Sequence, residues 1–250
     1  MNRAARYRFA FVGCGILLLE LLCRTGVIDR LTMQPPSEMV RDLVVLLASG
    51  SMNGAMLKTL INVAIACALA VAAGIAFGVA IHGHRAVRQG LEPLFATYYA
   101  IPVYAFYPLL IILFGLGDVP QILIGFMLAV VAVIVNTLNG LDRVSRAHMK
   151  TARVYRLGPI ATALKITLPS AAPYLLTGIK LAVAYAFIGV IGAEFIMSRT
   201  GIGYEISFAY NNFDNKTMYP LILLILAISI LINTAVSHWE KLLMQRRGRS

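Results

Sequence analysis

Few residues in this sequence combine the types and spacings that chemistry requires. No segment has the form G-x-x-x-x-G-K-[ST], and the glycine pairs Gly115-x-Gly117 and Gly201-x-Gly203 lack the strand and helix that a phosphate-binding loop joins. His82 and His84 have a spacing that can bind a metal, but the arginines that follow them favour a solvated basic loop. No set of serine, histidine and aspartate indicates nucleophilic catalysis. The sequence therefore predicts no catalytic residue, no metal and no cofactor in this chain.

Three ionisable residues fall inside long apolar runs: Glu20, Lys180 and Glu194. Charge within a membrane is costly, so such residues usually face the interior of a helix bundle or reach an interface. For Lys180 and Glu194, a structural role and contact with a transported solute are both open. For Glu20 we expect a structural role.

The composition indicates that the elements carrying these residues lie in a membrane. Hydrophobic residues make up 59% of the 250 residues and charged residues 13%, and the mean hydropathy is +0.79. These values lie outside the range of soluble domains. The net charge of +11 could indicate nucleic-acid binding, but the basic residues lie in short loops between apolar runs, which is typical of membrane proteins.

The apolar runs predict an all-α integral membrane protein with six transmembrane helices in a single domain, residues 1–250. The expected spans are 9–25, 59–81, 94–116, 119–138, 171–197 and 218–239. The first run could be a signal peptide, but no small-x-small cleavage site follows it, so we expect a retained span. Fifteen basic residues lie in the segments expected to be cytoplasmic and six in those expected outside, which predicts cytoplasmic N- and C-termini.

Three features of the spans and their connections carry structural predictions. An amphipathic helix is expected on the outer face over 36–49, with Ser37 as its N-cap. The span 59–81 contains Gly74-x-x-x-Gly78, and we expect it to be buried against neighbouring helices rather than lipid. The span 94–116 contains Pro102 and Pro108, which kink a helix and are tolerated where neighbours or a cavity satisfy the freed carbonyls.

One basic segment with helical spacing leads directly into the fifth span: Lys150 to Gly178, KTARVYRLGPIATALKITLPSAAPYLLTG. It resembles the cytoplasmic motif EAA-x3-G-x9-I-x-LP of permease subunits of binding-protein-dependent ABC importers. The second half of the motif is matched by Ala152, Ile166 and Leu168-Pro169. The first half diverges, because the positions of the motif's Glu, first Ala and Gly hold Lys150, Thr151 and Arg156.

The resemblance covers about residues 8 to 245 and points to the nitrate/sulfonate/taurine branch of these permeases. The further matching motifs are Pro35-Pro36-Ser37-Glu38, Ile101-Pro102 with Pro108, Gly115-x-Gly117, Asn136-Thr137-Leu138, Pro173-Tyr174, Thr177-Gly178 and Gly201-Ile202-Gly203-Tyr204. The resemblance implies the type I importer permease fold, with 150–166 as a coupling helix that seats in a groove of an ATPase subunit.

The resemblance assigns the contact with the ATPase to this segment. The residues expected to make or support it are Lys150, Thr151, Ala152, Arg153, Arg156, Leu157, Gly158, Ile166, Leu168 and Pro169. Leu168-Pro169 suits the exit of the coupling helix, because the residue before a proline avoids the helical region. The gain of Lys150 and Arg156 predicts a partner groove more acidic than is usual in the family. The alternative is a basic interfacial helix that binds anionic lipid.

The resemblance also implies the partners of an importer of the bacterial inner membrane. These are a second, most simply identical permease copy, ATP-binding subunits that hold ATP and Mg on the cytoplasmic side, and a periplasmic binding protein that docks on the outer loops. The solute would be a small organic or anionic compound. The residues expected to line its path are Tyr99, Pro102, Tyr104, Lys180 and Glu194.

Two alternatives concern the solute and the energy source. The aromatic residues Tyr98, Tyr99, Tyr104, Phe106 and Tyr107 suggest an aromatic or apolar solute, although packing or an interfacial belt also accounts for them. An ion-coupled secondary transporter is the alternative function. It would need carboxylates near the midplane and usually inverted repeats, whereas we find no repeat and few central acidic residues.

Overall fold

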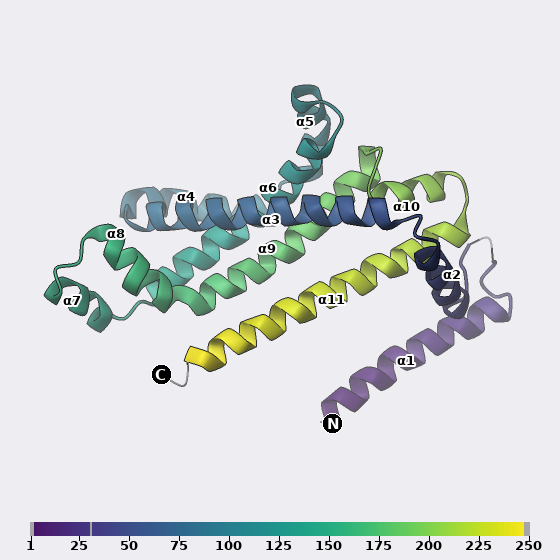
Figure 1. Cartoon of the computed structure of the whole chain (residues 1–250), viewed down its shortest axis with the longest axis horizontal. Helices are drawn as coiled ribbons and strands as arrows, with labels where there is room; N and C mark the ends of the chain where they lie inside the picture. The colour runs from purple at the N-terminus through teal and green to yellow at the C-terminus, as the bar shows by residue number, and fades with distance from the viewer. Residues whose placement is uncertain (1–2, 31, 248–250) are drawn as a thin grey trace. The chain divides into compact units, whose positions relative to one another are not determined.

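The computed structural model describes residues 3–30 and 32–247, and these residues form helices joined by turns, without a β-strand. The all-α prediction is confirmed. The elements, labelled in Figure 1, are α1 (Arg3–Arg24), α2 (Pro36–Ser49), α3 (Asn53–His82), α4 (Arg85–Tyr98), η1 (Val103–Phe106), α5 (Tyr107–Phe114), α6 (Asp118–Asp142), α7 (Arg146–Val154), α8 (Pro159–Thr162), η2 (Ala163–Thr167), α9 (Leu168–Met197), α10 (Ile202–Asn211) and α11 (Asn215–Arg247).

Four stretches of the described chain are long and apolar enough to cross a membrane: Asn53–His82, Asp118–Asp142, Ala163–Asn211 and Asn215–Leu243. Helix α4 with the η1–α5 arm would be a fifth span. Helix α1 is not among them, because Glu20 and the arginines near its two ends interrupt its apolar run. The count of six therefore stays a prediction, and so do the cytoplasmic termini, since both termini lie outside the described residues.

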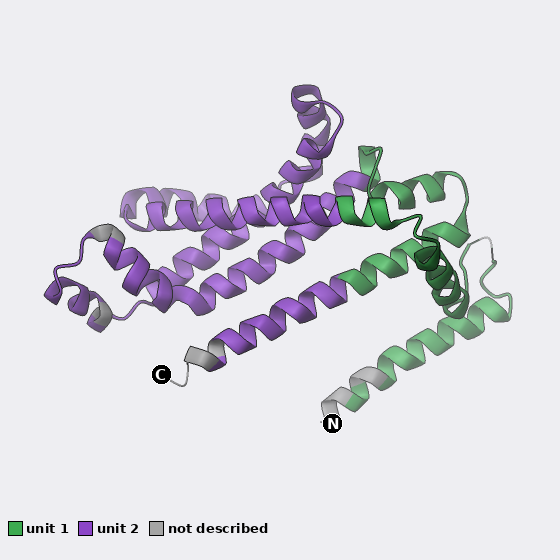
Figure 2. Ribbon diagram, in the orientation of Figure 1, with its two compact units in different colours: residues 1–58, 195–228 green, residues 59–194, 229–250 purple. Residues whose placement is uncertain are grey.

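The chain divides into two compact units, coloured separately in Figure 2: residues 1–58 with 195–228, and residues 59–194 with 229–250. The core of the first unit lies between α10 and the beginning of α11, and Leu43 and Leu46 of α2 pack against it. Its buried residues are Ile202, Ile206, Ala209, Met218, Leu221 and Leu224. The helix predicted over 36–49 therefore exists and is anchored by one apolar face.

The first turn of α2 is capped from α1 and not by Ser37. Helix α2 begins at Pro36, so Ser37 is already helical. The Glu20 carboxylate accepts hydrogen bonds from the Ser37 N–H at 3.0 Å and from the Ser37 hydroxyl at 2.6 Å. The expected N-cap is thus corrected, because a carboxylate supplied by α1 satisfies the free N–H. The structural role expected for Glu20 is consistent with these contacts.

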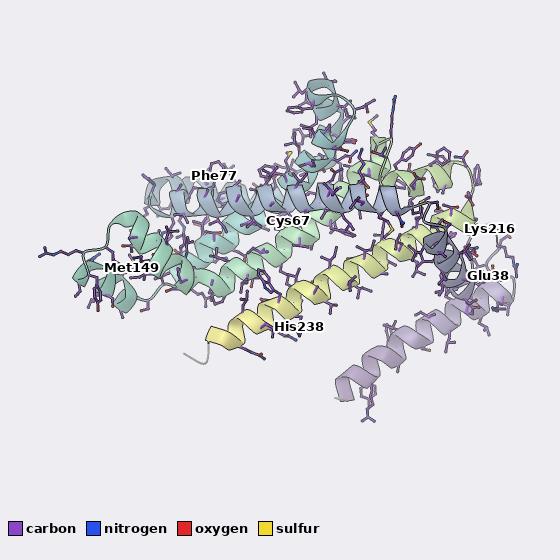
Figure 3. The ribbon with its side chains drawn as sticks, in the orientation of Figure 1. Glu38, Cys67, Phe77, Met149, Lys216 and His238 are labelled. Carbon is purple, nitrogen blue, oxygen red and sulfur yellow. The ribbon has the colours of Figure 1, made fainter. Side chains whose placement is uncertain are left out.

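The second unit is built on α6, which packs closely against α3 and α9. A Cβ atom at Gly74 would lie 2.5 Å from the Cβ of Val133, and one at Gly189 would lie 2.6 Å from the Cα of Gly125. Such close approach needs small residues at the crossings. Only the glycine face of α3 is buried, however, and Phe77, labelled in Figure 3, is exposed. Within this chain, the expected burial of the whole span 59–81 is therefore not found.

The segment predicted as one span over 94–116 consists of two arms that meet at an angle of 93°. Helix α4 ends at Tyr98, and the second arm begins at Val103. Pro102 lacks an N–H and disfavours helical geometry at Ile101, so the helix cannot continue through this point. Pro108 lies in the first turn of α5. An N–H at this position has no acceptor within the helix, so proline, which lacks the N–H, loses no hydrogen bond there.

Candidate functional site

Residues 150–169, which we call the coupling segment, do not form the single helix predicted over 150–166. Helix α7 ends at Val154, a turn follows, and α8 and the π-helical η2 then lead without a break into α9 at Leu168. Figure 1 shows α7 and α8 together at one end of the second unit, beside the beginning of α9. Leu168-Pro169 therefore begins α9 and does not end the coupling helix, because a proline is tolerated in the first turn of a helix.

The turn after α7 has the geometry of a glycine C-cap. Arg156 has a φ of 48°, in the left-handed region. Its N–H donates to the Arg153 carbonyl at 3.0 Å, and the N–H of Leu157 donates to the Ala152 carbonyl at 3.0 Å. These two hydrogen bonds define a Schellman motif, whose left-handed residue is usually glycine. The position that holds Gly in the importer motif therefore has the backbone geometry that favours glycine, although the residue here is arginine.

The two faces of the coupling segment differ in polarity. Ala152 is only 3% exposed, so its methyl group belongs to the packing of the segment and not to its free surface. Helix α7 packs against η2. Lys150, Arg153 and Arg156 are exposed, together with Thr151 and Gly158, whereas Leu157, Ile166 and Leu168 are half-buried and Pro169 is exposed. The structure thus gives the segment a basic outer face.

A cavity of about 590 Å³ separates the coupling segment from the ends of α3 and α6. Leu157 and Thr162 line it from the segment, Met149 lines it from α7 just before the segment, and His82 and Asp142 line it from the spans. The Asp142 carboxylate accepts two hydrogen bonds of 2.5 Å from the Arg88 guanidinium and lies 3.3 Å from the His82 ring. The pairing joins α6 to α4 and to the end of α3 beside the segment.

The tyrosines of the third predicted span are largely engaged in packing. The Tyr104 hydroxyl donates to the Ile188 carbonyl at 2.8 Å, and the Tyr98 hydroxyl donates to the Met127 carbonyl at 2.9 Å. Tyr99 is half exposed and stacks on Tyr185, with ring centroids 5.9 Å apart. Of these rings, Tyr99 has the most surface left for a solute. Pro102, also predicted on the path, is exposed at the break between the two arms.

Lys180 lies in a small cavity between α9 and the later part of α11. The cavity has a volume of about 160 Å³, and its polar lining residues are Lys180, Ser229 and Asn233. The Lys180 ammonium lies 3.7 Å from the Glu240 carboxylate. Lysine, hydroxyl and amide groups around an apolar floor can bind a small anion.

Glu194 belongs to a different, fully buried polar cluster. Its carboxylate is 0% exposed and accepts hydrogen bonds of 2.8 and 3.0 Å from the Thr59 hydroxyl. Beside it, the Asn62 amide donates to the Gln121 side chain at 3.0 Å. These contacts join α3, α6 and α9, and a buried carboxyl group held by hydrogen bonds indicates a structural role and not an open solute path.

The predicted path residues are therefore not brought together at one point. Lys180 and Glu194 lie on the same helix, separated by about 21 Å at the helical rise per residue. Val154 and Tyr155, which were not predicted, are exposed apolar residues of the coupling segment, and so is Leu164 further along it. Val154 and Tyr155 occupy two of the variable positions before the motif's Gly. Only this place in the motif could have indicated that their side chains are exposed. The buried partners Thr59, Asn62 and Gln121 could have been noticed as polar residues inside apolar runs.

Comparison with known proteins gives the family. The family model described as the binding-protein-dependent transport system inner membrane component matches residues 70–249. The chain is 30% identical to the nitrate import permease protein NrtB of Leptolyngbya laminosa, over 59% of this chain and 53% of that protein. It is 27% identical to the bicarbonate transport system permease protein CmpB of Synechocystis sp., over 62% of this chain and 56% of that protein.

A relative of similar length is a probable ABC transporter permease protein of Brucella abortus, which is 25% identical over 92% of this chain and 91% of that protein. The chain spans about half the length of NrtB and CmpB. The family model, by contrast, covers well over half of the chain and includes the whole coupling segment. The chain belongs to the family of binding-protein-dependent transport system inner membrane components.

Proposed function

We propose that the chain is the transmembrane permease subunit of an ATP-driven importer. It provides the path for a small solute that a periplasmic binding protein delivers, and it has no ATPase site of its own. Two ATP-binding subunits, which hold ATP and Mg, grip the coupling segments of two permease copies. ATP-driven closure of these subunits then rocks the two copies to expose the path alternately to the two sides of the membrane.

The observation that carries this proposal is the turn at Arg156. The importer motif has a glycine at this position, and the chain keeps the left-handed backbone and both Schellman hydrogen bonds without the glycine. The retained geometry supports the motif alignment even where the residues of its first half differ. It therefore supports an ATPase contact for residues 150–169. We propose that the chain lies in the bacterial inner membrane with this segment and both termini on the cytoplasmic side, as the distribution of basic residues predicts.

The solute we propose is a small anion. Two of the relatives are named for nitrate and bicarbonate, which are small oxyanions. The cavity beside Lys180 has a size and a set of polar groups that suit such an ion. An aromatic solute has less support, because Tyr98 and Tyr104 use their hydroxyls in hydrogen bonds to neighbouring helices.

The substitution Ala152→Asp tests the coupling assignment. Ala152 is 3% exposed, so an aspartate there buries a charge and disturbs the packing of the segment. We expect the variant, purified with the ATPase subunits, to lose most of the ATP hydrolysis that the loaded binding protein stimulates. The matched control is Ala86→Asp, which adds the same charge at an exposed residue of α4 outside the segment. Equal hydrolysis by both variants and the unmodified complex would show that the segment does not couple.

A further inference from the structure

A groove with a cavity volume of about 280 Å³ lies between α4 and α6 in the second unit. The Arg88 guanidinium, near the beginning of α4, bonds to the Asp142 carboxylate at the end of α6. The Tyr98 hydroxyl, at the end of α4, donates to the Met127 carbonyl further back in α6. The two helices therefore run antiparallel and are joined near both ends of α4, and the small side chain of Ala96 lines the groove between these contacts.

Polar and apolar residues separate along this groove. The end beside the coupling segment is lined by Arg88 and Glu92 of α4 and by Asn139 of α6. The rest of the lining is apolar or aromatic on both helices, and it consists of Phe95, Ala96, Tyr99, Val135 and Leu138. A cavity with a charged end and an apolar length is complementary to an amphipathic molecule.

The length of the groove matches one leaflet of a bilayer. Arg88 and Tyr99 are eleven residues apart, which corresponds to about 16 Å along a helix. Half of the hydrocarbon core of a bilayer is about 15 Å thick. With its charged end beside the coupling segment, the groove therefore has room for a lipid head group at the membrane surface and for an acyl chain below it.

The charges at the polar end select the head group. The Arg88 guanidinium uses two of its five N–H groups on Asp142, and the remaining ones can donate to phosphate oxygens together with the Asn139 amide. Among the ion pairs formed by described residues, none involves the exposed Glu92 carboxylate, which can pair with an ammonium. With His82 neutral, the one positive and two negative charges at this end disfavour a purely anionic head group.

We propose that the groove binds one phospholipid whose head group carries both a phosphate and an ammonium, as in phosphatidylethanolamine. The phosphate accepts hydrogen bonds from Arg88 and Asn139, the ammonium pairs with Glu92, and an acyl chain lies past Ala96 toward Tyr99. Head groups bind in this way in polar pockets between membrane helices. The inference does not depend on the proposed importer, because it needs only this chain and a bilayer.

The same observations favour a lipid over a transported solute or a second copy of the chain. A small anion would lose its hydration in the apolar length of the groove without gaining hydrogen bonds there. A second protein chain laid over the groove would bury the Glu92 carboxylate, which is costly without a cationic partner. A lipid satisfies both ends, because its head group stays at the surface.

The test uses the full chain in nanodiscs made from equal amounts of phosphatidylethanolamine and phosphatidylglycerol. After release into mild detergent, native mass spectrometry counts the lipids that each chain retains. We expect one retained lipid per chain, with phosphatidylethanolamine favoured by about tenfold or more. Glu92→Gln should abolish this preference, whereas Glu92→Asp, which keeps the charge, should keep most of it.

A second variant tests the apolar length. Ala96→Leu should lower the retention of either lipid by about tenfold, because leucine fills the groove. The matched control is Ala86→Leu, which adds the same volume at an exposed residue of α4 outside the lining. Ala86, Glu92 and Ala96 are all exposed, so the variants should unfold at the same temperature as the unmodified chain in lipid-free detergent. Added phosphatidylethanolamine should raise that temperature for the unmodified chain and not for Ala96→Leu.

Four results would overturn the inference. Equal retention of the two lipids by the unmodified chain would contradict the head-group selection. Equal retention by Ala96→Leu and Ala86→Leu would show that the groove holds no acyl chain. Unchanged lipid retention in Ala96→Leu would assign the groove to the solute if uptake is lost, and to a second copy if the dimer is lost. All these results are independent of whether an ATPase binds the chain, so they are distinguishable from a failure of the proposed function.

Discussion

At the scale of single residues, the chain twice places a bulky side chain where a helix C-cap favours glycine. Besides Arg156, Phe213 has a φ of 55° at the end of α10. Its N–H donates to the Tyr210 carbonyl at 3.1 Å, and the N–H of Asp214 donates to the Ala209 carbonyl at 2.9 Å, which completes a second Schellman motif. The sequence indicated the first turn through the motif's Gly position. It contained no signal for the second, because phenylalanine is not typical of a C-cap.

Replacing Phe213 with glycine should stabilise the chain. The ring is 91% exposed, so its removal loses little packing, whereas relief of the left-handed strain is worth about 1 kcal/mol. Thermal unfolding in detergent should shift upward by about 2–4 °C. Phe213→Ala is the matched control, because it removes the ring but keeps the Cβ that causes the strain. A gain as large for alanine as for glycine would mean that the exposed ring, and not the backbone, is the source of the effect.

At the scale of elements, the sequence predicts helices well where apolar residues repeat with helical spacing. It predicts helix boundaries poorly where a proline lies at or near the boundary. The helix over 36–49 and the apolar runs of α3, α6, α9 and α11 follow directly from the pattern of apolar residues. The break at Pro102 could be expected only as a kink, since the angle depends on how the second arm packs against α6. The sequence predicts a helix end at Pro169, although the first turn of α9 also tolerates a proline, and sequence alone does not separate these two roles.

The candidate site could be predicted only in part for a similar reason. The motif identified the coupling segment, but it did not tell which residues face outward. Ala152 matches the motif and proves to be buried, whereas Val154 and Tyr155 lie at variable positions and are exposed. The sequence groups Lys180 and Glu194 because both are ionisable residues in apolar runs. Their different surroundings, a polar cavity and a buried hydrogen-bonded cluster, depend on helices distant in sequence.

The close crossing of α3 and α6 yields a prediction at this scale. An alanine at Gly74 would place its Cβ 2.5 Å from the Cβ of Val133, so the two helices must separate. We expect Gly74→Ala to lower the free energy of unfolding by about 1–3 kcal/mol. Gly54→Ala is the matched control in the same helix, because a Cβ there meets no atom within 4 Å. It should be neutral or slightly stabilising, as alanine favours helix more than glycine does. Equal thermal stability of the two variants would contradict the packing described for this crossing.

At the scale of the whole molecule, the chain is a family member with several helices apolar enough to cross a membrane, and its second unit carries the basic coupling segment at one end. The sequence has no segment of the form G-x-x-x-x-G-K-[ST], so in the proposed importer we expect the energy to enter through the coupling segment from another chain. This dependence on a partner separates the importer from an ion-coupled secondary transporter, which would work without an ATPase and would respond to a proton or sodium gradient.

The most direct test of the importer is a gentle detergent pull-down of the tagged chain from its native host, followed by mass spectrometry of the proteins that accompany it. We predict a soluble P-loop ATPase in stoichiometric amount, retained by the unmodified chain. Crosslinking from a cysteine placed at Arg153, on the exposed face of the coupling segment, should join that ATPase to the chain. The absence of any ATPase, even after crosslinking, would contradict the importer, and uptake driven by an ion gradient would then be the function to examine.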